Sequence, residues 1–154
     1  MAKDKEYWNP FYDIAESPNY LYVYVSVLYA WGLKPSKRYF FLHDIKRKNN
    51  QCVDKEGKKV KLPFFHKRIK VDEMFTFDPN ICAWSTDVTY YHIYMKSGDR
   101  ERVLTIQSPY KYKYKPFFWI LDTIDRDNGG HPRLERLFYR ILVRIMKLFN
   151  IDYH

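Results

Sequence analysis

The feature that most constrains the fold is a two-residue alternation on both sides of a tight turn. Residues 87–107, DVTYYHIYMKSGDRERVLTIQ, place Ser97-Gly98-Asp99 between two runs rich in β-branched and aromatic residues. Such a pattern is typical of a β-hairpin. Successive side chains of a strand point to opposite faces, so the first arm should sort its residues into two sets. These sets are Tyr90, His92 and Tyr94 on one face, and Tyr91, Ile93 and Met95 on the other.

Shorter β patterns fill the middle of the chain. Residues 37–47 (KRYFFLHDIKR) predict a strand, and residues 52–62 predict a hairpin around a turn at 54–57. A further run, 67–77 (KRIKVDEMFTF), is expected to form a strand that ends at the Asp78-Pro79-Asn80 turn. The middle of the chain is therefore expected to be mainly β.

The segment 17–33 carries two conflicting patterns. Its alternation of Tyr and Val is typical of a strand. Ser17 as an N-cap with Pro18 behind it, and Gly32 and Pro35 at the other end, are instead the start and stop signals of a helix. We favour a helix because both ends carry such signals. In either conformation, apolar residues on all sides predict a buried element.

Two helices are expected in the C-terminal part. The first should begin at Pro116 and end near Arg126, where the DRDNGG segment, 125–130, interrupts the pattern. Its inward residues should be Phe117, Ile120, Leu121 and Ile124. The second should begin with Pro132 at its first position and continue to about Phe149.

Together these elements predict an α+β fold in a single domain that spans residues 1–154. We expect an antiparallel sheet or partly open barrel of about five to seven strands, with a helix near the N-terminus and two C-terminal helices. The domain would comprise a buried N-terminal element at 1–33, a basic β-rich middle at 34–107, and the two helices at 116–149.

The last helix has two distinct faces on a helical wheel. Eight large apolar residues fall within an arc of roughly 140°, and we expect this face to pack in the core. They are Leu134, Leu137, Phe138, Ile141, Leu142, Ile145, Leu148 and Phe149. Five cations fall within roughly 80° on another side, and we call them the basic ridge. They are Arg133, Arg136, Arg140, Arg144 and Lys147.

The basic ridge predicts a polyanionic partner. Like charges at i,i+4 spacing repel one another, and a partner that neutralises them removes this cost. The planar fork of arginine also fits phosphate or carboxylate better than the point charge of lysine. Nucleic acid, either DNA or RNA, is the partner that we favour, an acidic protein surface is the alternative, and a solvated face without a partner stays open. We expect no membrane partner, because the apolar face is expected to serve as core.

Cations and rings also coincide in the middle of the chain. The net charge is +9, and residues 34–70 contain thirteen basic and three acidic side chains. Lys67 and Arg68 follow a Phe pair, and Lys111, Lys113 and Lys115 alternate with tyrosines. Single-stranded nucleic-acid binders combine cations for phosphates with rings for stacking, and exposed tyrosines would contact bases or sugars. In the alternating stretch, the tyrosines are expected to cover the core edge while the lysines face outward.

The sequence contains no recognisable catalytic motif. It has no glycine-rich phosphate loop, GxSxG or HExxH motif, and we expect no catalytic residue, no metal and no cofactor. Asp122, Asp125, Asp127 and His131 could hold a divalent metal for nuclease chemistry. We favour the interpretation that these acidic residues flank a turn at 128–130 and stabilise the start of the next helix.

Cysteine usage and the N-terminal sequence favour a cytoplasmic protein. Cys52 and Cys82 lie thirty residues apart without a CxxC motif, so we expect buried free thiols. The first residues lack the pattern of a signal peptide, and the most apolar stretch, 20–31, is too short and too Tyr-rich to span a bilayer.

The function that this sequence predicts is non-enzymatic nucleic-acid binding, as in a small regulator or accessory factor of a phage or mobile element. The alternative is a protein-interaction module, either an inhibitor or an adaptor, that docks its basic face on an acidic protein.

Overall fold

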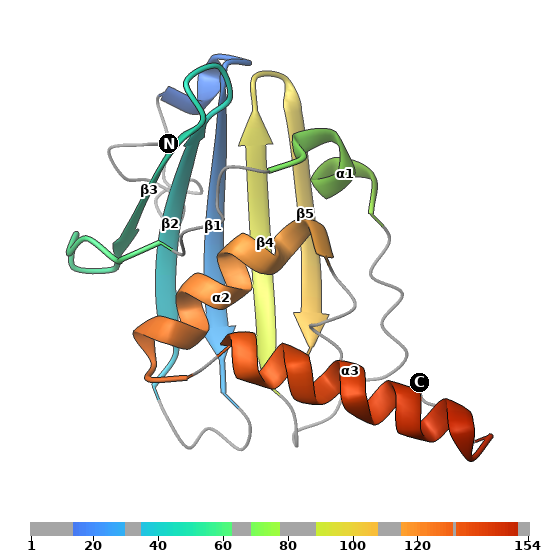
Figure 1. Cartoon of the computed structure of the whole chain (residues 1–154). Helices are drawn as coiled ribbons and strands as arrows, with labels where there is room; N and C mark the ends of the chain where they lie inside the picture. Colours follow the sequence, from blue (N-terminus) through green and yellow to red (C-terminus); the bar gives the residue numbers. More distant parts are fainter. Residues whose placement is uncertain are drawn as a thin grey trace.

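The computed structural model describes residues 14–29, 35–62, 69–77, 89–107, 115–130 and 132–150. Figure 1 shows its strands and helices: β1 (Tyr20–Leu28), β2 (Lys37–Asp44), β3 (Asn49–Asp54), α1 (Val71–Thr76), β4 (Tyr90–Ser97), β5 (Arg100–Gln107), α2 (Phe118–Asp127) and α3 (Pro132–Leu148). Short 3₁₀ turns at Ile14–Glu16 and Lys115–Phe117 precede β1 and α2.

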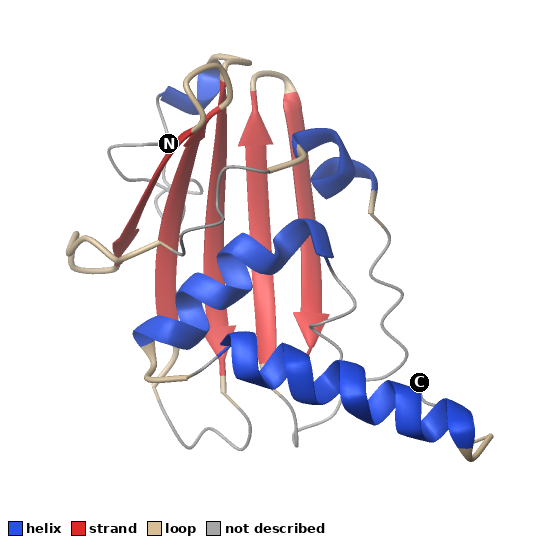
Figure 2. Cartoon of the chain, viewed as in Figure 1, coloured by secondary structure: helices blue, strands red, loops and turns tan. Residues whose placement is uncertain are grey.

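The five strands form one open antiparallel sheet in the order β3-β2-β1-β4-β5. Tyr24 at the middle of β1 lies opposite Phe40 of β2 and Tyr94 of β4. Figure 2 shows α2 crossing one face of this sheet and α3 lying across its lower end. The predicted α+β fold with two C-terminal helices is therefore confirmed, and the sheet is open.

The main core lies between the sheet and α2. Alternation along β1 sends four fully buried side chains to this side: Leu21, Val23, Val25 and Val27. The residues that the sequence predicted to point inward from the first C-terminal helix are also buried: Phe117, Ile120, Leu121 and Ile124. One periodic strand and one periodic helix thus meet along their apolar faces.

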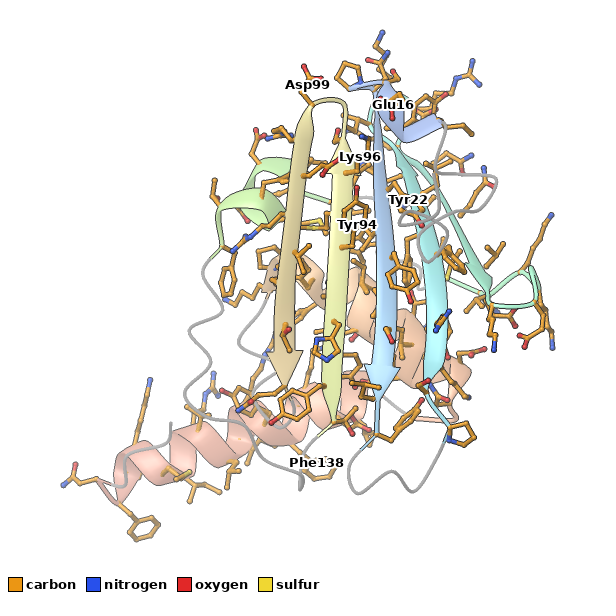
Figure 3. All side chains as sticks on the ribbon, turned by 180° about the vertical axis from the view of Figure 1, so that it is seen from behind. Glu16, Tyr22, Tyr94, Lys96, Asp99 and Phe138 are labelled. Atoms are coloured by element: carbon orange, nitrogen blue, oxygen red, sulfur yellow. The ribbon has the colours of Figure 1, made fainter. Side chains whose placement is uncertain are left out.

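The opposite face of the sheet carries a second buried cluster. Its members are Tyr22, Tyr24, Phe40, Leu42 and Tyr94. Figure 3 shows Tyr22 and Tyr94 on neighbouring strands, with their ring centroids 6.2 Å apart in an edge-on arrangement. Above them, Lys96 lies 3.1 Å from Glu101 and 3.3 Å from Glu16, which connects the N-terminal turn to β4. The central strand is consequently buried on both faces.

The helix favoured for residues 17–33 is wrong, because β1 occupies Tyr20–Leu28. The Ser17 hydroxyl accepts a hydrogen bond from the Asn19 N–H at 3.2 Å, in a turn ahead of the strand. Apolar residues on all sides of a segment fit a buried helix, but they equally fit a central strand that is covered on both faces. The prediction that this element is buried is confirmed.

The strand expected at 67–77 is wrong for its described part, because residues 71–76 form the short helix α1. Arg102 of β5 donates Nη1 to the Met74 carbonyl at 2.9 Å and Nη2 to the Phe77 carbonyl. Carbonyls at the helix end therefore have partners without a neighbouring strand. The fully buried Met74 side chain holds the helix against the core.

The strand predicted at 37–47 and the hairpin at 87–107 are confirmed, whereas the hairpin predicted at 52–62 forms only its turn and one isolated bridge, because β3 (Asn49–Asp54) pairs with β2 instead. The β4–β5 hairpin turns at Gly98 and Asp99, and its first arm divides into the two predicted faces. Gly98 has a φ of 60°, which glycine adopts at little cost. β2 covers most of the predicted strand at 37–47. After β3 the chain turns at 54–57, and Val53 pairs with Lys59.

Candidate docking surface on α3

The connection between α2 and α3 is fixed by its own polar residues. Tyr39 of β2 donates its hydroxyl to Asp127 Oδ2 at 2.7 Å. The side-chain amide of Asn128 donates to the carbonyl of Ile124 at 2.7 Å. The Gly130 N–H donates to the carbonyl of Asp125, also at 2.7 Å. These bonds end α2 over β2 and set the direction in which α3 begins.

The acidic residues near this connection are used in contacts within the protein. Asp127 accepts the Tyr39 hydroxyl, and Asp122 is fully buried against Arg136. No group of three or more His, Cys, Asp or Glu side chains that could hold a metal occurs among the described residues, which do not include His131. The chain turns at residues 128 and 129, where the sequence predicted a turn.

Arg136 joins α3 to α2. Its Nη1 lies 2.9 Å from Oδ2 of Asp122, and its guanidinium carbon lies 5.0 Å from the centroid of the Phe118 ring. The side chain of Asp122 is 0% exposed and that of Arg136 is 16% exposed. A carboxylate buried to this depth requires a partner charge, so Arg136 holds the two helices in one arrangement.

A narrow flank of α3 contacts the rest of the protein. Four of its side chains are half-buried: Arg136, Tyr139, Val143 and Met146. On a helical wheel they fall within about 80°, whereas every other side chain from residue 134 to residue 148 is exposed. We call these four residues the inner flank.

The predicted core face of α3 is exposed, so the prediction that it packs in the core is wrong. We call this face the apolar stripe, and its members are 45–81% exposed: Leu134, Leu137, Phe138, Ile141, Leu142, Ile145, Leu148 and Phe149. Its centre lies about 150° around the helix from the inner flank. Figure 3 shows Phe138 at the lower edge of the molecule, pointing away from the sheet. The ion pair at Arg136 lies on the inner flank, so this flank, and not the apolar stripe, faces the body.

The remaining described cations of the basic ridge are exposed beside this stripe. Arg140, Arg144 and Lys147 are solvent-exposed and form no ion pair with another described residue. The helix backbone includes Arg133, but its side chain lies outside the described residues. α3 therefore presents an apolar face that is bordered on one side by positive charge.

Of the other predicted binding residues, the described part of the chain brings only Lys115 to α3, where it lines one cavity with Arg136 and Arg140. Lys115 is exposed at the 3₁₀ turn before α2. Lys67, Arg68, Lys111 and Lys113 lie outside the described residues. Further exposed lysines occur in the β2–β3 turn and in the loop after β3, which Figure 1 places far from α3. Positive charge is thus distributed over separate places, apart from one cavity that Lys70, Lys115, Arg136 and Arg140 line together.

The described tyrosines are buried or half-buried, so they offer no open stacking platform. Burial, followed by the hydrogen bond to Asp127, raises the pKa of Tyr39. Burial likewise raises the pKa of Tyr91, and the charge of Asp125 adds to the effect. Cys52 is a buried free thiol, and its burial raises its pKa as well, which agrees with the sequence prediction for this residue.

A cavity of about 700 Å³ lies where α3 approaches the beginnings of α1 and α2. Arg136, Leu137 and Arg140 contribute one wall from α3. Lys115 and Trp119 contribute another wall, from the 3₁₀ turn and from α2. The sequence did not predict this cavity, because its walls come from segments far apart in the chain.

The exposed apolar stripe was also missed, although the sequence held a signal for it. The apolar residues Val143 and Met146 lie on the side of the wheel opposite the stripe, which left two candidate faces for packing.

None of the described helices is both long enough and apolar enough to cross a membrane. Comparisons of the chain with protein-family models, curated proteins and solved structures find no match.

Proposed function

We propose that this protein is a non-enzymatic binding protein that docks through α3 into an apolar groove on an acidic protein partner. The observation that carries the proposal is the exposure of the apolar stripe, which gathers eight large side chains on one helix face. Scattered apolar residues are normal on a surface, but a contiguous row of this size is typical of an interaction site. Its spacing of i, i+3, i+4 and i+7 is that of helix-in-groove recognition.

The charge on α3 favours an acidic partner. Arg140, Arg144 and Lys147 border the apolar stripe on one side, while the other border carries only Glu135 among its charged residues. Opposite charge along one edge of a partner groove would speed the encounter and fix the register of the helix.

A second copy of this chain fits the same surface poorly. Two-fold antiparallel pairing of α3 helices would place the cationic border of one copy beside the cationic border of the other. Parallel pairing would place it opposite a border whose single charge is Glu135. Neither arrangement neutralises Arg140, Arg144 and Lys147, so the partner should carry its own carboxylates.

An anionic bilayer also fits less well. A buried apolar face would exclude a membrane partner, but the apolar stripe is exposed, so this reason no longer applies. Helices that lie in a bilayer surface, however, carry cations along the polar face, and the bilayer meets both borders of such a helix equally. On α3 the described cations lie on one border, and the inner flank packs on the protein body.

Nucleic-acid binding is the second candidate. It is favoured by the exposure of Arg140, Arg144 and Lys147 and by the net charge of +9. Phosphate contacts would then supply most of the affinity, and binding would weaken steeply with salt. The separation of the described cations and the burial of the described tyrosines count against it.

A pair of designed peptides tests the docking proposal. Both peptides carry a Leu/Ile/Phe helix face, which is bordered by glutamates in one peptide and by lysines in the other. Fluorescence anisotropy should detect binding of the acidic peptide and little binding of the basic one. Ile141→Ser combined with Ile145→Ser should weaken binding at least tenfold, or by about 1.4 kcal/mol, because two anchors are removed.

Val103→Ser is the matched control, because Val103 is an aliphatic residue on β5 that is 69% exposed. It should leave peptide binding unchanged. Equal loss in both variants, or equal binding of the two peptides, would refute docking through α3. A labelled single-stranded oligonucleotide whose binding falls with salt and ignores the Ile141 and Ile145 changes would favour the second candidate.

A further inference from the structure

The cavity between α1, α2 and α3 has the size of a small-molecule site. Its volume of about 700 Å³ lies within the range of pockets that hold cofactors and metabolites. Three elements and the 3₁₀ turn before α2 contribute to its walls, so the fold assembles it from distant parts of the sequence. This cavity is separate from the outward face of the apolar stripe, apart from Leu137, which belongs to both.

The charges of the described residues at the cavity leave an excess of two positive groups. Lys70 is offset by Glu73, whose carboxylate lies 3.4 Å from its ammonium group. Arg136 is offset by Asp122 at 2.9 Å. Lys115 and Arg140 also line the cavity, and neither forms an ion pair with another described residue. The site is therefore suited to a ligand that carries about two negative charges.

The apolar part of the lining favours a flat ring. Phe118, Trp119 and Leu137 belong to the walls, and the Arg136 guanidinium already lies over the Phe118 ring at 5.0 Å. Aromatic and guanidinium planes are good stacking partners for an aromatic ligand. The Trp119 ring is 4% exposed and packs edge-on against Phe41 at 5.4 Å, so it closes the cavity from the core side. Among the described residues its indole N–H finds no hydrogen-bond acceptor.

We propose that this cavity binds a small aromatic phosphate monoester. A phosphate monoester carries about −1.5 to −2 charge at pH 7 and three acceptor oxygens, which matches Lys115 and Arg140 in charge. The guanidinium of Arg140 can hold such a group through two parallel N–H bonds, and the ring occupies the apolar part of the cavity. This proposal does not depend on docking through α3.

Phenyl phosphate is the probe for this site, with phenol and inorganic phosphate as its separate halves. Binding is measured by isothermal titration calorimetry and by the indole N–H signals in ¹H–¹⁵N NMR spectra, where Trp119→Phe assigns the Trp119 signal. Phenyl phosphate should bind saturably and shift that signal. Each half alone should bind at least tenfold more weakly, because it lacks one of the two sets of contacts.

Matched variants locate the site. Lys115→Gln and Arg140→Gln should each weaken phenyl phosphate binding several-fold, and the double variant should weaken it at least tenfold. Arg144→Gln combined with Lys147→Gln removes two cations from the same helix outside the cavity and should change binding less than about twofold.

Several outcomes would overturn the proposal. They are absence of saturable binding, equal loss in the two double variants, and a Trp119 signal that does not move on titration. Binding of inorganic phosphate as tight as that of phenyl phosphate would also overturn it. The Ile141→Ser/Ile145→Ser variant should keep its affinity for phenyl phosphate, so failure at the cavity and failure of docking can be told apart.

Discussion

Arg136 of α3 and Asp122 of α2 form a buried ion pair, with 2.9 Å between Nη1 and Oδ2. Arg136 belongs to the inner flank of α3, as does Tyr139. The centre of this flank lies about 150° around the helix from the centre of the apolar stripe. Because the Asp122 side chain is fully buried, the arginine cannot turn outward without leaving a carboxylate without its counter-charge. One residue of the predicted basic ridge therefore packs against the body, together with Tyr139, Val143 and Met146, on the flank that faces away from the apolar stripe.

Removing this arginine should destabilise the fold. Arg136→Gln is expected to lower the free energy of unfolding by about 3 kcal/mol, because it leaves a buried charge uncompensated. Urea unfolding followed by circular dichroism measures the loss. Adding Asp122→Asn to the same chain should restore a large part of it, since the buried charge is then also removed. An unchanged unfolding midpoint in Arg136→Gln would show that the pair does not hold the two helices.

Substitutions at two isoleucines should distinguish the buried face of α2 from the exposed face of α3. Ile120→Ala in α2 should cost about 2–5 kcal/mol, because Ile120 is fully buried. Ile141→Ala in α3 should change stability by less than about 0.5 kcal/mol, because Ile141 is 45% exposed. The same unfolding experiment measures both variants. Similar losses at the two positions would mean that the apolar stripe is packed against the core.

Alkaline pH should unfold the protein in part through its buried tyrosines. Tyr39 and Tyr91 have folded-state pKa values above the ordinary value, chiefly because of burial. The unfolded chain thus loses these protons first, near pH 10, and the stability contributed by the neutral phenols is complete below that pH. Above it, stability should fall by up to about 1.4 kcal/mol per pH unit for each phenol.

Unfolding free energies at pH 9 and pH 11, together with tyrosinate absorbance, measure this effect. Tyr39→Phe should lessen the dependence on pH, because it removes one of the two phenols from the folded core. A free energy of unfolding that is equal at the two pH values would contradict this account of the buried phenols.

The turn between α2 and α3 should tolerate no side chain at Gly130. A Cβ built there would lie 2.9 Å from the Asp125 carbonyl oxygen, which is too close for real contacts. Gly130→Ala is expected to cost about 1–3 kcal/mol, because the backbone must move. Gly129→Asn is the control, since the space around Gly129 is open and Asn tolerates its φ of 81°. Thermal unfolding of the two variants provides the comparison, and equal melting temperatures would count against the close approach.

The local sequence pattern was sufficient to predict those elements whose periodicity fits only a strand or only a helix. The β4–β5 hairpin, β2 and both C-terminal helices follow from alternation, turn residues and proline positions. It was insufficient for β1, because this strand is buried on both faces and carries apolar residues on both, a pattern that also fits a buried helix. It was also insufficient for α1, where Arg102 from β5 supplies partners that the local sequence does not contain.

The same division applies to the candidate site. The sequence by itself determined that residues 132–148 form a helix with an apolar face and a cationic border, because helix geometry places i, i+3 and i+4 neighbours together. Only the tertiary structure decided which side of that helix faces the body. A wheel holds no information on the buried Asp122, whose carboxylate pairs with Arg136 on the flank that Tyr139, Val143 and Met146 also pack against the body.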